Sequence, residues 1–454
     1  MSKTLCEFRF DPAPNRWVLG RRTPGAGALR FREQLGLSVN GPLVLSGHQA
    51  ELWHGGILAK HFAAAAFAAK TGAATGWIVV DQDEAEDPSM AVPVRDQQGR
   101  LRTWRWRWAE SIGRVACGLA PVKPPEPRLE AGLRWANESI ADRVEVIRRA
   151  LLANASAPNW AEQVSQAAGA MIGEVAPAPR SVYESRLAGT ELFASVVAAL
   201  VREASGAMSA YNRAIAEAGD SGMRPLDERI GELPLWAVKN GRRMRVLATE
   251  AGALDPTTLA PRGMLMTALL RLAGCELFVH GVGGGAYDRA TERWVAAWTG
   301  ELGRIASDFG GAGALAPMVV ATADLRLPLA ASEVPSEEEI ARGVWRAHHA
   351  RHDPAMLGDA TGAEEKAGIL ERIRARKSAN QSPAPEFAEL HALLERSRSR
   401  RGQALESLRA AAARLKEQQQ DAAVAHARTW SFALQPPGAL RSMFDQTQAA
   451  FGKW

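Results

Sequence analysis

The sequence contains few cysteines, and this argues against two classes of small, cross-linked fold. Its 454 residues include three cysteines, Cys6, Cys117 and Cys275. Their positions show no paired spacing, which argues against a disulfide framework and against a zinc ribbon. A chain of this length can instead be stabilised by a sizeable apolar core.

Long apolar runs are also missing. No stretch reaches the roughly 18 consecutive apolar residues of a membrane-spanning helix, so we expect no transmembrane segment and no membrane partner. The first six residues lack the apolar centre of a signal peptide. We therefore expect a cytoplasmic protein.

Charge of one sign is not gathered in any tail. The formal net charge of +5 is spread among arginine-rich patches, which suits small anionic ligands as readily as nucleic acid. Hydrophobic residues make up 46% of the chain and charged residues 23%, as in ordinary globular proteins. The length gives about three domains as a first expectation.

The segment Gly41–Asp87 has the pattern of a strand, a helix and a second strand. Short apolar runs begin at Leu43 and Trp77 and are flanked by glycine, as in strands buried on both faces. Between them, Leu58–Lys70 is rich in alanine, the strongest helix former, and Gly72 can close the helix. This order predicts parallel strands joined by a right-handed crossover.

Polar side chains follow both of these predicted strands. His48 and Gln49 follow the first strand, and Asp81–Glu84 follow the second. In open parallel sheets, ligands bind beyond the carboxyl ends of the strands, so we interpret these residues as one half of a binding site. The alternative is that they are ordinary solvated loop residues.

A further strand, followed by a loop and a helix, is predicted far downstream in the chain. A helix beginning at Pro261 precedes a strand at Cys275–His280, after which Gly281–Gly285 leads into a helix at Asp288–Trp298. Backbone N–H groups at such a helix start can hold a phosphate or a carboxylate. The spacing matches neither the dinucleotide fingerprint nor a Walker loop, and the alternative is a tight turn that needs positive φ. If both segments share one sheet, this strand should be the central neighbour of the strand at Leu43.

Two β-hairpins are predicted between these segments. Trp104–Trp108 alternates Trp and Arg, which places the Trp side chains on one face of a strand. We favour packing of that face on the core, with stacking on nucleobases as the alternative. Asn240-Gly241 is a strong hairpin signal, and the arginines that follow it, Arg242, Arg243 and Arg245, suit either a bound phosphate or a solvated edge.

The C-terminal third of the chain is predicted to be helical. Ser336 begins a capping box for a helix through His348. His348 and His352 are spaced to place two metal ligands on one helix face, but no third ligand is evident, and we favour a solvated helix end. From Phe387 to Arg428, apolar residues at helical spacing predict one helix of about 40 residues. Such a helix suits a coiled-coil arm paired with Glu364–Lys377, or with a second subunit.

Several of these motifs resemble, in chain order, those of the bacillithiol biosynthesis cysteine-adding enzymes (BshC). Ser46–Gln49 and His54–Gly56 resemble the Thr-Gly-Gln-Gln and Thr-Gly-Pro turns of that family. Trp77–Glu84 resembles its Trp-bearing strand with an acidic turn, Glu232–Val246 its Leu-Pro-Leu-Trp hairpin, and Gly281–Tyr287 its turn before an Ala-Tyr pair. The chain departs from the family at His48, where Gln is usual, at His54, where Thr is usual, and at Gln82-Asp83, where Asp-His is usual.

The resemblance implies an α/β fold with a Rossmann-like core of the nucleotidyltransferase type. The core would comprise residues 1–87 and 261–330, with a mixed α+β insertion at 88–260, a helical coiled coil at 331–430 and a tail at 431–454 that packs on the core. It also implies ligation of cysteine to malyl-glucosamine and a homodimer formed through the coiled coil. ATP with Mg²⁺ follows by analogy alone, because the chain has neither a Walker lysine nor a Lys-Met-Ser-Lys-Ser-like loop.

On this basis we predict a site built from both halves of the core. Three residues are expected to have catalytic roles, namely His48, His54 and Asp83. Substrate or anion binding is assigned to Ser46, Gly47, Gln49, Gly55, Gly56, Asp81, Glu84, Gly283, Gly284, Gly285 and Tyr287. No dedicated metal ligands are assigned. The alternative functions are a non-catalytic dimeric scaffold that binds a metabolite and, more weakly supported, an RNA-binding protein.

Overall fold

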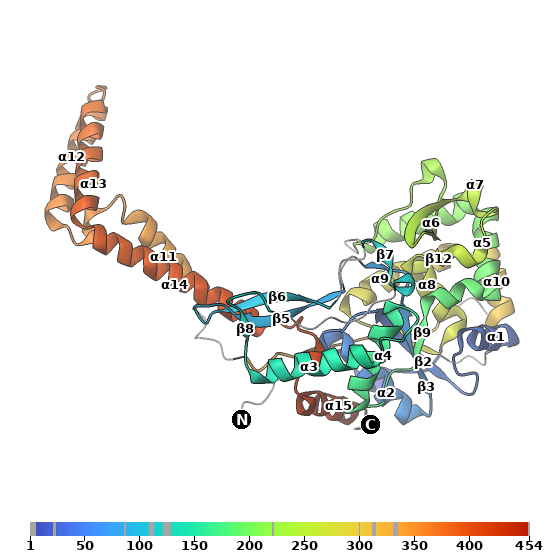
Figure 1. The fold of residues 1–454 in the computed structure, drawn as a ribbon. Helices are drawn as coiled ribbons and strands as arrows, with labels where there is room; N and C mark the ends of the chain where they lie inside the picture. Colours follow the sequence, from blue (N-terminus) through green and yellow to red (C-terminus); the bar gives the residue numbers. More distant parts are fainter. Residues whose placement is uncertain are drawn as a thin grey trace. The chain divides into compact units, whose positions relative to one another are not determined.

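A computed structural model of the chain describes residues 6–20, 24–85, 88–108, 113–120, 129–219, 222–298, 300–310, 315–329 and 335–452 (Figure 1). The chain forms two compact units. The first comprises Met1–Val94, Thr103–Leu327 and Ala427–Trp454, and the second comprises Arg95–Arg102 and Pro328–His426. The five-part division made from the sequence stays a prediction, and its boundary residues 87 and 330 lie outside the described residues.

The first unit is a mixed α/β structure built on a six-stranded sheet. The strand order is β1-β14-β13-β2-β3-β9, in which β1 is antiparallel to its neighbour and the other strands are parallel. The strands are β1 (Glu7–Asp11), β2 (Leu43–Gln49), β3 (Ala74–Val80), β9 (Ser181–Tyr183), β13 (Leu277–His280) and β14 (Met318–Asp324).

The prediction that the two distant strands are central neighbours is confirmed. Leu277 of β13 pairs with Val44 of β2, and both strands lie in the middle of the sheet. From β2 the chain continues outward on one side through β3 and β9, and from β13 it continues on the other side to β14. The order therefore reverses between β2 and β13, and a crevice forms at such a point beyond the strand ends.

Helices cover both faces of this sheet because its central strands are apolar on both sides. On β2, Val44 belongs to one apolar cluster, and Leu43 and Leu45 belong to another. The Val44 cluster contains side chains of α2 (Gly55–Thr71) and α15 (Pro437–Gly452). The other cluster contains side chains from these helices: α1 (Ala26–Leu35), α5 (Glu191–Arg202), α6 (Ala204–Ala218), α8 (Gly263–Leu269), α9 (Val282–Ala297) and α10 (Glu301–Gly310). Figure 1 shows this layered arrangement.

Two helices begin earlier in the chain than the sequence predicts. Helix α2 starts at Gly55 rather than Leu58, because the side chain of His54 caps its first turn. It ends at Thr71, and Gly72 closes it in the left-handed conformation with φ of 69°. Helix α9 starts at Val282 rather than Asp288, so the glycine run forms its first turn. The alternative of a positive-φ turn at Gly281–Gly285 is therefore wrong.

Another element boundary also differs from the prediction. Pro261 does not begin a helix but ends the short strand β12 (Leu259–Pro261), and α8 starts at Gly263. The helix continues as a π-helical turn over Leu270–Gly274. Pairing of β12 with β10 (Glu232–Lys239) holds Pro261 in extended conformation.

Both predicted hairpins are confirmed. Strand β6 (Leu101–Arg107) pairs with β5 (Ser89–Arg95), which lies between β6 and β8 (Arg134–Trp135) in a three-stranded sheet. In β6, Trp106 is buried and the arginines are more exposed. This favours the core-packing interpretation over stacking on nucleobases. The turn between β10 and β11 (Arg242–Leu247) has positive φ at both Asn240 and Gly241, as a type I′ turn requires.

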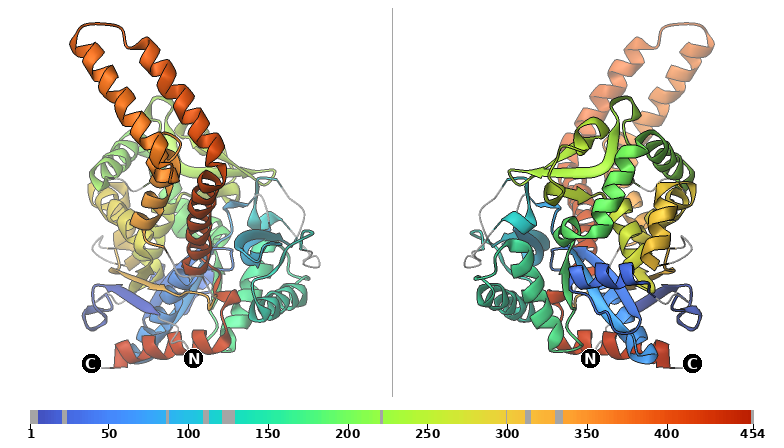
Figure 2. Two further views of the ribbon diagram at one scale, coloured as in Figure 1. Left: turned by 90° about the vertical axis from the view of Figure 1, so that its left-hand side faces the viewer. Right: turned by 90° about the vertical axis from the view of Figure 1, so that its right-hand side faces the viewer.

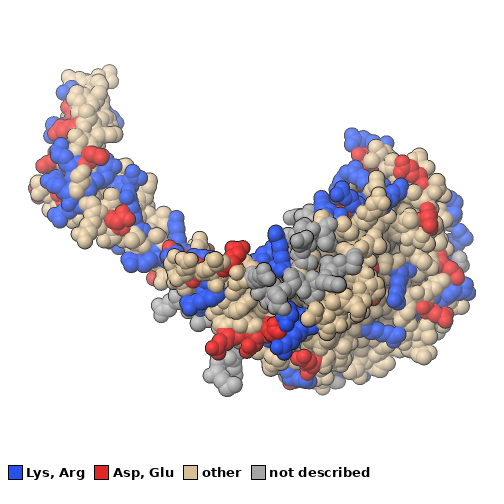
Figure 3. All heavy atoms as spheres, viewed as in Figure 1, with Lys and Arg blue, Asp and Glu red and all other residues tan. Residues whose placement is uncertain are grey.

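The remaining elements of the first unit connect these parts. Its strands also include β4 (Glu84–Ala85), β7 (Val115–Ala116) and β12. Further helices are α3 (Glu138–Ala153), α4 (Trp160–Gly173) and α7 (Ala248–Ala251). Lys and Arg side chains are interspersed with Asp and Glu over the face shown in Figure 3, so the net charge is spread as the sequence suggests.

The second unit is formed mainly by four helices, α11 (Glu337–His349), α12 (Ala360–Ser378), α13 (Ala384–Arg400) and α14 (Gly402–His426). The single helix predicted from Phe387 to Arg428 is wrong, because the chain leaves helical geometry at Arg401. Helix α12 packs against α13, as predicted for Glu364–Lys377, and α11 packs against α14 (Figure 2). The capping box at Ser336 is confirmed.

Two observations concern membranes and metals. Among the described residues, no single helix is long and apolar enough to cross a membrane. The pair α5 and α6 passes that test together, but it is bent by 99° and contributes many side chains to the core of the first unit. His352 lies beyond the end of α11, and the described ranges contain no group of three or more His, Cys, Asp or Glu residues placed to hold a metal ion.

Candidate functional site

A cavity of about 670 Å³ lies in the first unit at the carboxyl ends of its parallel strands. Strands β2, β3, β13 and β14, or the residues just after them, each contribute lining residues, and helices α2 and α9 begin in its wall. Residues from both predicted halves of the site therefore meet. The predicted site residues that line it are Gly47, His48, Gln49, His54, Gly56, Asp83, Gly283, Gly284 and Tyr287.

Three of the remaining predicted residues do not line the cavity but pack against the elements that form its wall. Ser46 is fully buried, and its hydroxyl donates to the carbonyl of Val279 at 2.8 Å, which ties β2 to β13. A Cβ at Gly55 would lie 2.6 Å from the side chain of Leu325, so this glycine allows α2 to pack against the end of β14. Gly285 is packed equally closely, and none of the three is a lining residue.

The other two predicted residues are already paired with protein groups. Asp81 lines a separate cavity of about 360 Å³, where its carboxylate accepts hydrogen bonds from the backbone N–H and hydroxyl of Ser185. Glu84 accepts a hydrogen bond from the backbone N–H of Arg243 at 2.7 Å. Both therefore position neighbouring segments of the site.

His54 has a fixed orientation and a fixed tautomer. Its Nδ1 accepts a hydrogen bond from the backbone N–H of Gly56 at 3.1 Å, so in the neutral ring Nε2 carries the hydrogen. Burial lowers the pKa of His54, and the charges of Arg428 and Lys60 lower it further. His54 is thus a neutral hydrogen-bond donor at pH 7.

Lys60 was not predicted from the sequence, yet it is a central residue of the cavity wall. It lies on α2, is 5% exposed, and donates from Nζ to the carbonyl of Gly47 at 2.6 Å. Burial lowers its pKa to about 7. An anion bound beside Lys60 would favour its charged form.

His48 is not positively charged in this site, although a histidine side chain can carry a positive charge. Burial, followed by the charges of Lys60 and His54, lowers the pKa of His48 to about 3. Its Nδ1 is buried and has no hydrogen-bond partner within the described ranges. His48 is therefore a neutral group with an unsatisfied nitrogen in the wall of the cavity. It suits hydrogen bonding better than proton transfer at neutral pH.

A second group in the cavity is acidic. Asp83 accepts hydrogen bonds from Gln49 at 3.1 Å and from Arg243. Glu184 is buried, and one of its carboxyl oxygens, Oε2, has no hydrogen-bond partner among the residues described. Burial and the charges of Asp81 and Asp83 raise the pKa of Glu184 well above its usual range. An ammonium group bound here would compensate both carboxyl groups.

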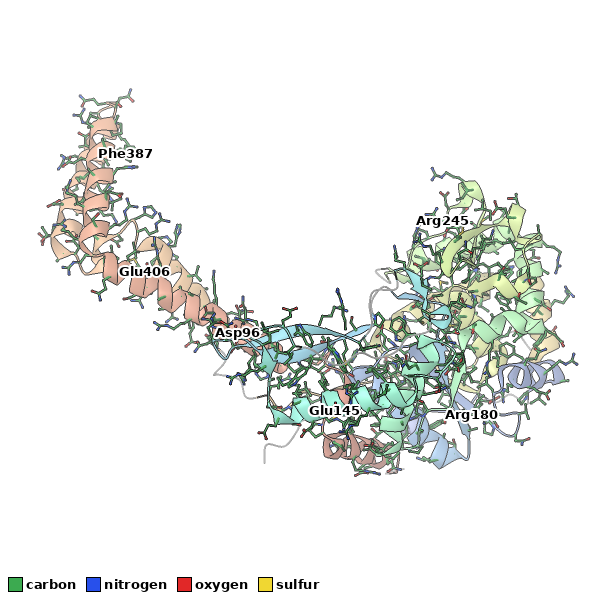
Figure 4. The ribbon with its side chains drawn as sticks, in the orientation of Figure 1. Asp96, Glu145, Arg180, Arg245, Phe387 and Glu406 are labelled. Carbon is green, nitrogen blue, oxygen red and sulfur yellow. The ribbon has the colours of Figure 1, made fainter. Side chains whose placement is uncertain are left out.

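The arginines after the Asn-Gly turn have different environments. Arg243 reaches Asp83 and lies over the ring of Trp236, which also lines the cavity. Arg245, which is labelled in Figure 4, is partly exposed. Its side chain pairs with Glu232 at 3.5 Å. Only Arg243 of the three arginines predicted there is a lining residue. Its contacts connect β11 to the acidic group.

The start of α9 provides donors on the opposite half of the core. Gly281 caps this helix without a side-chain hydrogen bond, and a Cβ at Gly281 would lie 3.6 Å from Cδ of Lys60. A Cβ at Gly283 would meet no atom within 4 Å, so a ligand can approach the backbone there. Together, His54, Lys60, Arg428 and the first turn of α9 form what we call the donor group, and Asp83, Glu184 and Gln49 form the acceptor group.

The two groups define what the cavity can bind. The donor group suits a carboxylate or a phosphate, and the acceptor group suits a protonated amine. A third cluster, His280 with Asp288 and Arg271, lies at the end of β13. No family model matches the chain, and a search of curated proteins found no match.

Proposed function

We propose that the protein is an amide-forming ligase that joins an amino acid of the cysteine type to a small carboxylate-bearing sugar conjugate. The proposal includes a Rossmann-like core and a relationship to the bacillithiol biosynthesis cysteine-adding enzymes. The observation that carries it is the presence of a donor group and an acceptor group in one cavity of about 670 Å³. The reversal of strand order beside the cavity and the motifs shared with that family support the same function.

The acceptor group is suited to hold the amine of the amino acid. Asp83 is partly exposed, and among the described residues Oε2 of Glu184 has no hydrogen-bond partner. A bound ammonium would favour the charged form of Glu184 and would leave Asp83 as its counter-ion. The donor group would then hold a carboxylate, through Lys60 and the Nε2–H of His54.

The donor group also fits a phosphate chain. The start of α9 offers N–H groups without a side-chain cap and an open surface at Gly283. Lys60 gains a full positive charge when an anion approaches, because its pKa is about 7 without one. A nucleoside triphosphate, when bound, would supply the activating group that a free carboxylate lacks. A magnesium ion would accompany its phosphates rather than occupy a cage of protein ligands.

This chain's own residues would bind and orient the reactants. Lys60 and the first turn of α9 would neutralise negative charge, and Asp83 would hold the amine close to the acyl carbon. Apolar lining residues such as Phe278 and Met266 would limit access of water. Bringing two bound reactants together in this way accounts for much of the rate enhancement in ligases that do no covalent catalysis.

We also propose that the helical unit forms a coiled coil that mediates a homodimer. Its surface exposes two large apolar side chains, Trp345 at 53% and Phe387 at 38%. Phe387 lies on α13 toward the end of the helix pair (Figure 4). A second copy of the same unit would cover such residues.

A second candidate function is a metabolite-binding protein without turnover. It is favoured by one observation, that Asp83 is already paired with Gln49 and Arg243. Such a protein would bind an amino acid but form no product.

The test is a reaction of the purified protein with cysteine, malyl-glucosamine and ATP, followed by mass spectrometry. We expect a product with the mass of the two substrates less one water, lost in Asp83→Asn and kept in Asp142→Asn, an exposed position on α3. Calorimetry with cysteine separates the two functions. Binding without product supports the non-catalytic candidate, and neither binding nor product contradicts both.

A further inference from the structure

His280 is the last residue of β13 and lines the cavity. Its Nε2 lies 2.9 Å from Oδ2 of Asp288, which is fully buried on α9. The same Oδ2 accepts a hydrogen bond from Nη1 of Arg271 at 2.7 Å. A histidine at the cavity wall is thus backed by a buried carboxylate and a buried guanidinium.

This arrangement fixes the tautomer of His280. The carboxylate of Asp288 accepts from Arg271 and can only accept from the imidazole, so Nε2 carries the hydrogen in the neutral ring. Nδ1 then has a free lone pair, and within the described ranges it takes part in no hydrogen bond. A Cβ at Gly284 would lie 2.6 Å from Nδ1, so the glycine leaves this nitrogen unobstructed.

The charges behind His280 suit a proton acceptor. Arg271 is held by the carbonyl of Ala316 at 2.7 Å and by Glu292 at 2.6 Å, in addition to Asp288. Two carboxylates therefore face one guanidinium, and the cluster carries one excess negative charge beside the imidazole. A positive charge that forms on His280 during a reaction would be stabilised by this excess.

The other basic groups of the cavity are less suited to this role. His54 uses Nδ1 to cap α2, and His48 has a pKa of about 3. Lys60 donates to a backbone carbonyl and faces the region assigned to anions. Among the described residues, His280 contacts Asp288, which is paired with Arg271, and Arg271 is paired in turn with Glu292. Lys60 and Tyr287 line the same cavity.

We propose that His280 is the general base of the ligase, and that Asp288 is the residue that positions it. This rests on the proposed function. The substrate ammonium loses one proton to Nδ1 of His280, and the lone pair freed in this way forms the new C–N bond to the acyl carbon. The second proton that the nitrogen loses leaves on an oxygen of the departing activating group. The bond from that carbon to its phosphate-type activating group breaks, and the electron pair leaves with the oxygen of that group, which a nucleoside triphosphate supplies.

The first test uses nitrogen NMR of the histidine rings in the full-length protein. In wild type, His280 should show a single neutral tautomer, with hydrogen on Nε2 and none on Nδ1, and titration with cysteine should shift the Nδ1 resonance. The exposed His391 of α13 serves as the reference, with mixed tautomers and no shift. Hydrogen on Nδ1 of His280, or no response to bound cysteine, would overturn the proposal.

The second test is kinetic. His280→Gln can still donate to Asp288, so it should fold and bind cysteine, yet its kcat should fall about 10²- to 10⁴-fold with KM nearly unchanged. Asp288→Asn should lower kcat in the same way. His280→Ala should recover activity when imidazole is added, which a purely structural residue would not allow.

These experiments distinguish failure of the His280 proposal from failure of the proposed ligase function. If wild type forms the amide and His280→Gln keeps its kcat, the proposal about His280 is wrong and the proposed function stands. If wild type forms no amide, the proposed function fails, and the NMR result still decides whether His280 presents a free Nδ1 to a bound amine.

Discussion

At the scale of single residues, burial in the folded protein disfavours the charged form of Lys60. Burial lowers its pKa from the usual 10.5 to about 7, so between these values the folded chain binds fewer protons than the unfolded chain. The free energy of unfolding due to Lys60 therefore rises with pH across this window and is lowest below pH 7. An anionic ligand would offset this cost at the site.

This gives a first prediction. Lys60→Met should be more stable than wild type at pH 6, and its advantage should shrink by pH 9.5, because only wild type gains stability over that range. Lys70→Met, at an exposed position of the same helix, should show no such pH dependence. Thermal unfolding at both pH values is the measurement, and a constant difference between Lys60→Met and wild type would contradict the assignment.

Gly47 gives a second residue-scale prediction. A Cβ at this position would lie 2.4 Å from the backbone carbonyl oxygen of Ile78, so Gly47→Ala should destabilise the protein by about 1–3 kcal/mol or more. Gly169→Ala, on α4 with no atom within 4 Å of the new Cβ, should instead stabilise it by about 0.5–1 kcal/mol. Urea unfolding of the pair checks both signs.

Single residues also show what the sequence could and could not indicate. His48 and Asp83 are predicted because polar residues after apolar runs mark strand ends, and His54 is predicted from the resemblance of His54–Gly56 to a family turn. All three line the cavity. Lys60 was missed because it lies inside an alanine-rich helix, where a lone lysine normally reaches solvent. Glu184 was missed because only tertiary packing brings it to the cavity, from a segment with no motif of its own.

At the scale of elements, the start of α2 combines capping with a site function. The cap comes from Nδ1 of His54, and the donor that faces the cavity is its Nε2. A substitution can separate these two roles, because asparagine is a good N-cap but lacks the second ring nitrogen.

We therefore predict different outcomes for two variants of His54. His54→Ala should lose about 0.5–2 kcal/mol of stability together with activity. His54→Asn should keep most of the stability and still lose affinity for an anionic ligand. Thermal unfolding and calorimetry with malyl-glucosamine distinguish them, and full binding by His54→Asn would show that the ring has no role beyond the cap.

Element boundaries were harder to predict than element types. The strands β2, β3 and β13 were recognised from apolar runs between glycines. The start of α9 was placed too late, because glycine is a poor helix former in general and is tolerated in a first turn that few side chains crowd. The break at Arg401 was missed because helical spacing of apolar residues continues on both sides of it.

At the scale of the whole molecule, the proposed dimer gives a fourth prediction. The full-length chain should sediment at twice the mass of one chain, and the double variant Trp345→Arg, Phe387→Glu should sediment as a monomer, because it places charge on exposed apolar positions of the helical unit. An unchanged mass in the variant would show that the dimer interface does not depend on these two side chains. A wild-type monomer at all concentrations would exclude the dimer.

The central claim is that this cavity joins a cysteine-type amino acid to a second small molecule. The measurement that tests it most directly is mass spectrometry of low-molecular-mass thiols in source cells with and without the gene. We predict a cysteine conjugate that disappears on deletion and returns with the wild-type gene but not with Asp83→Asn. A thiol pool that is unchanged by the deletion would contradict the account.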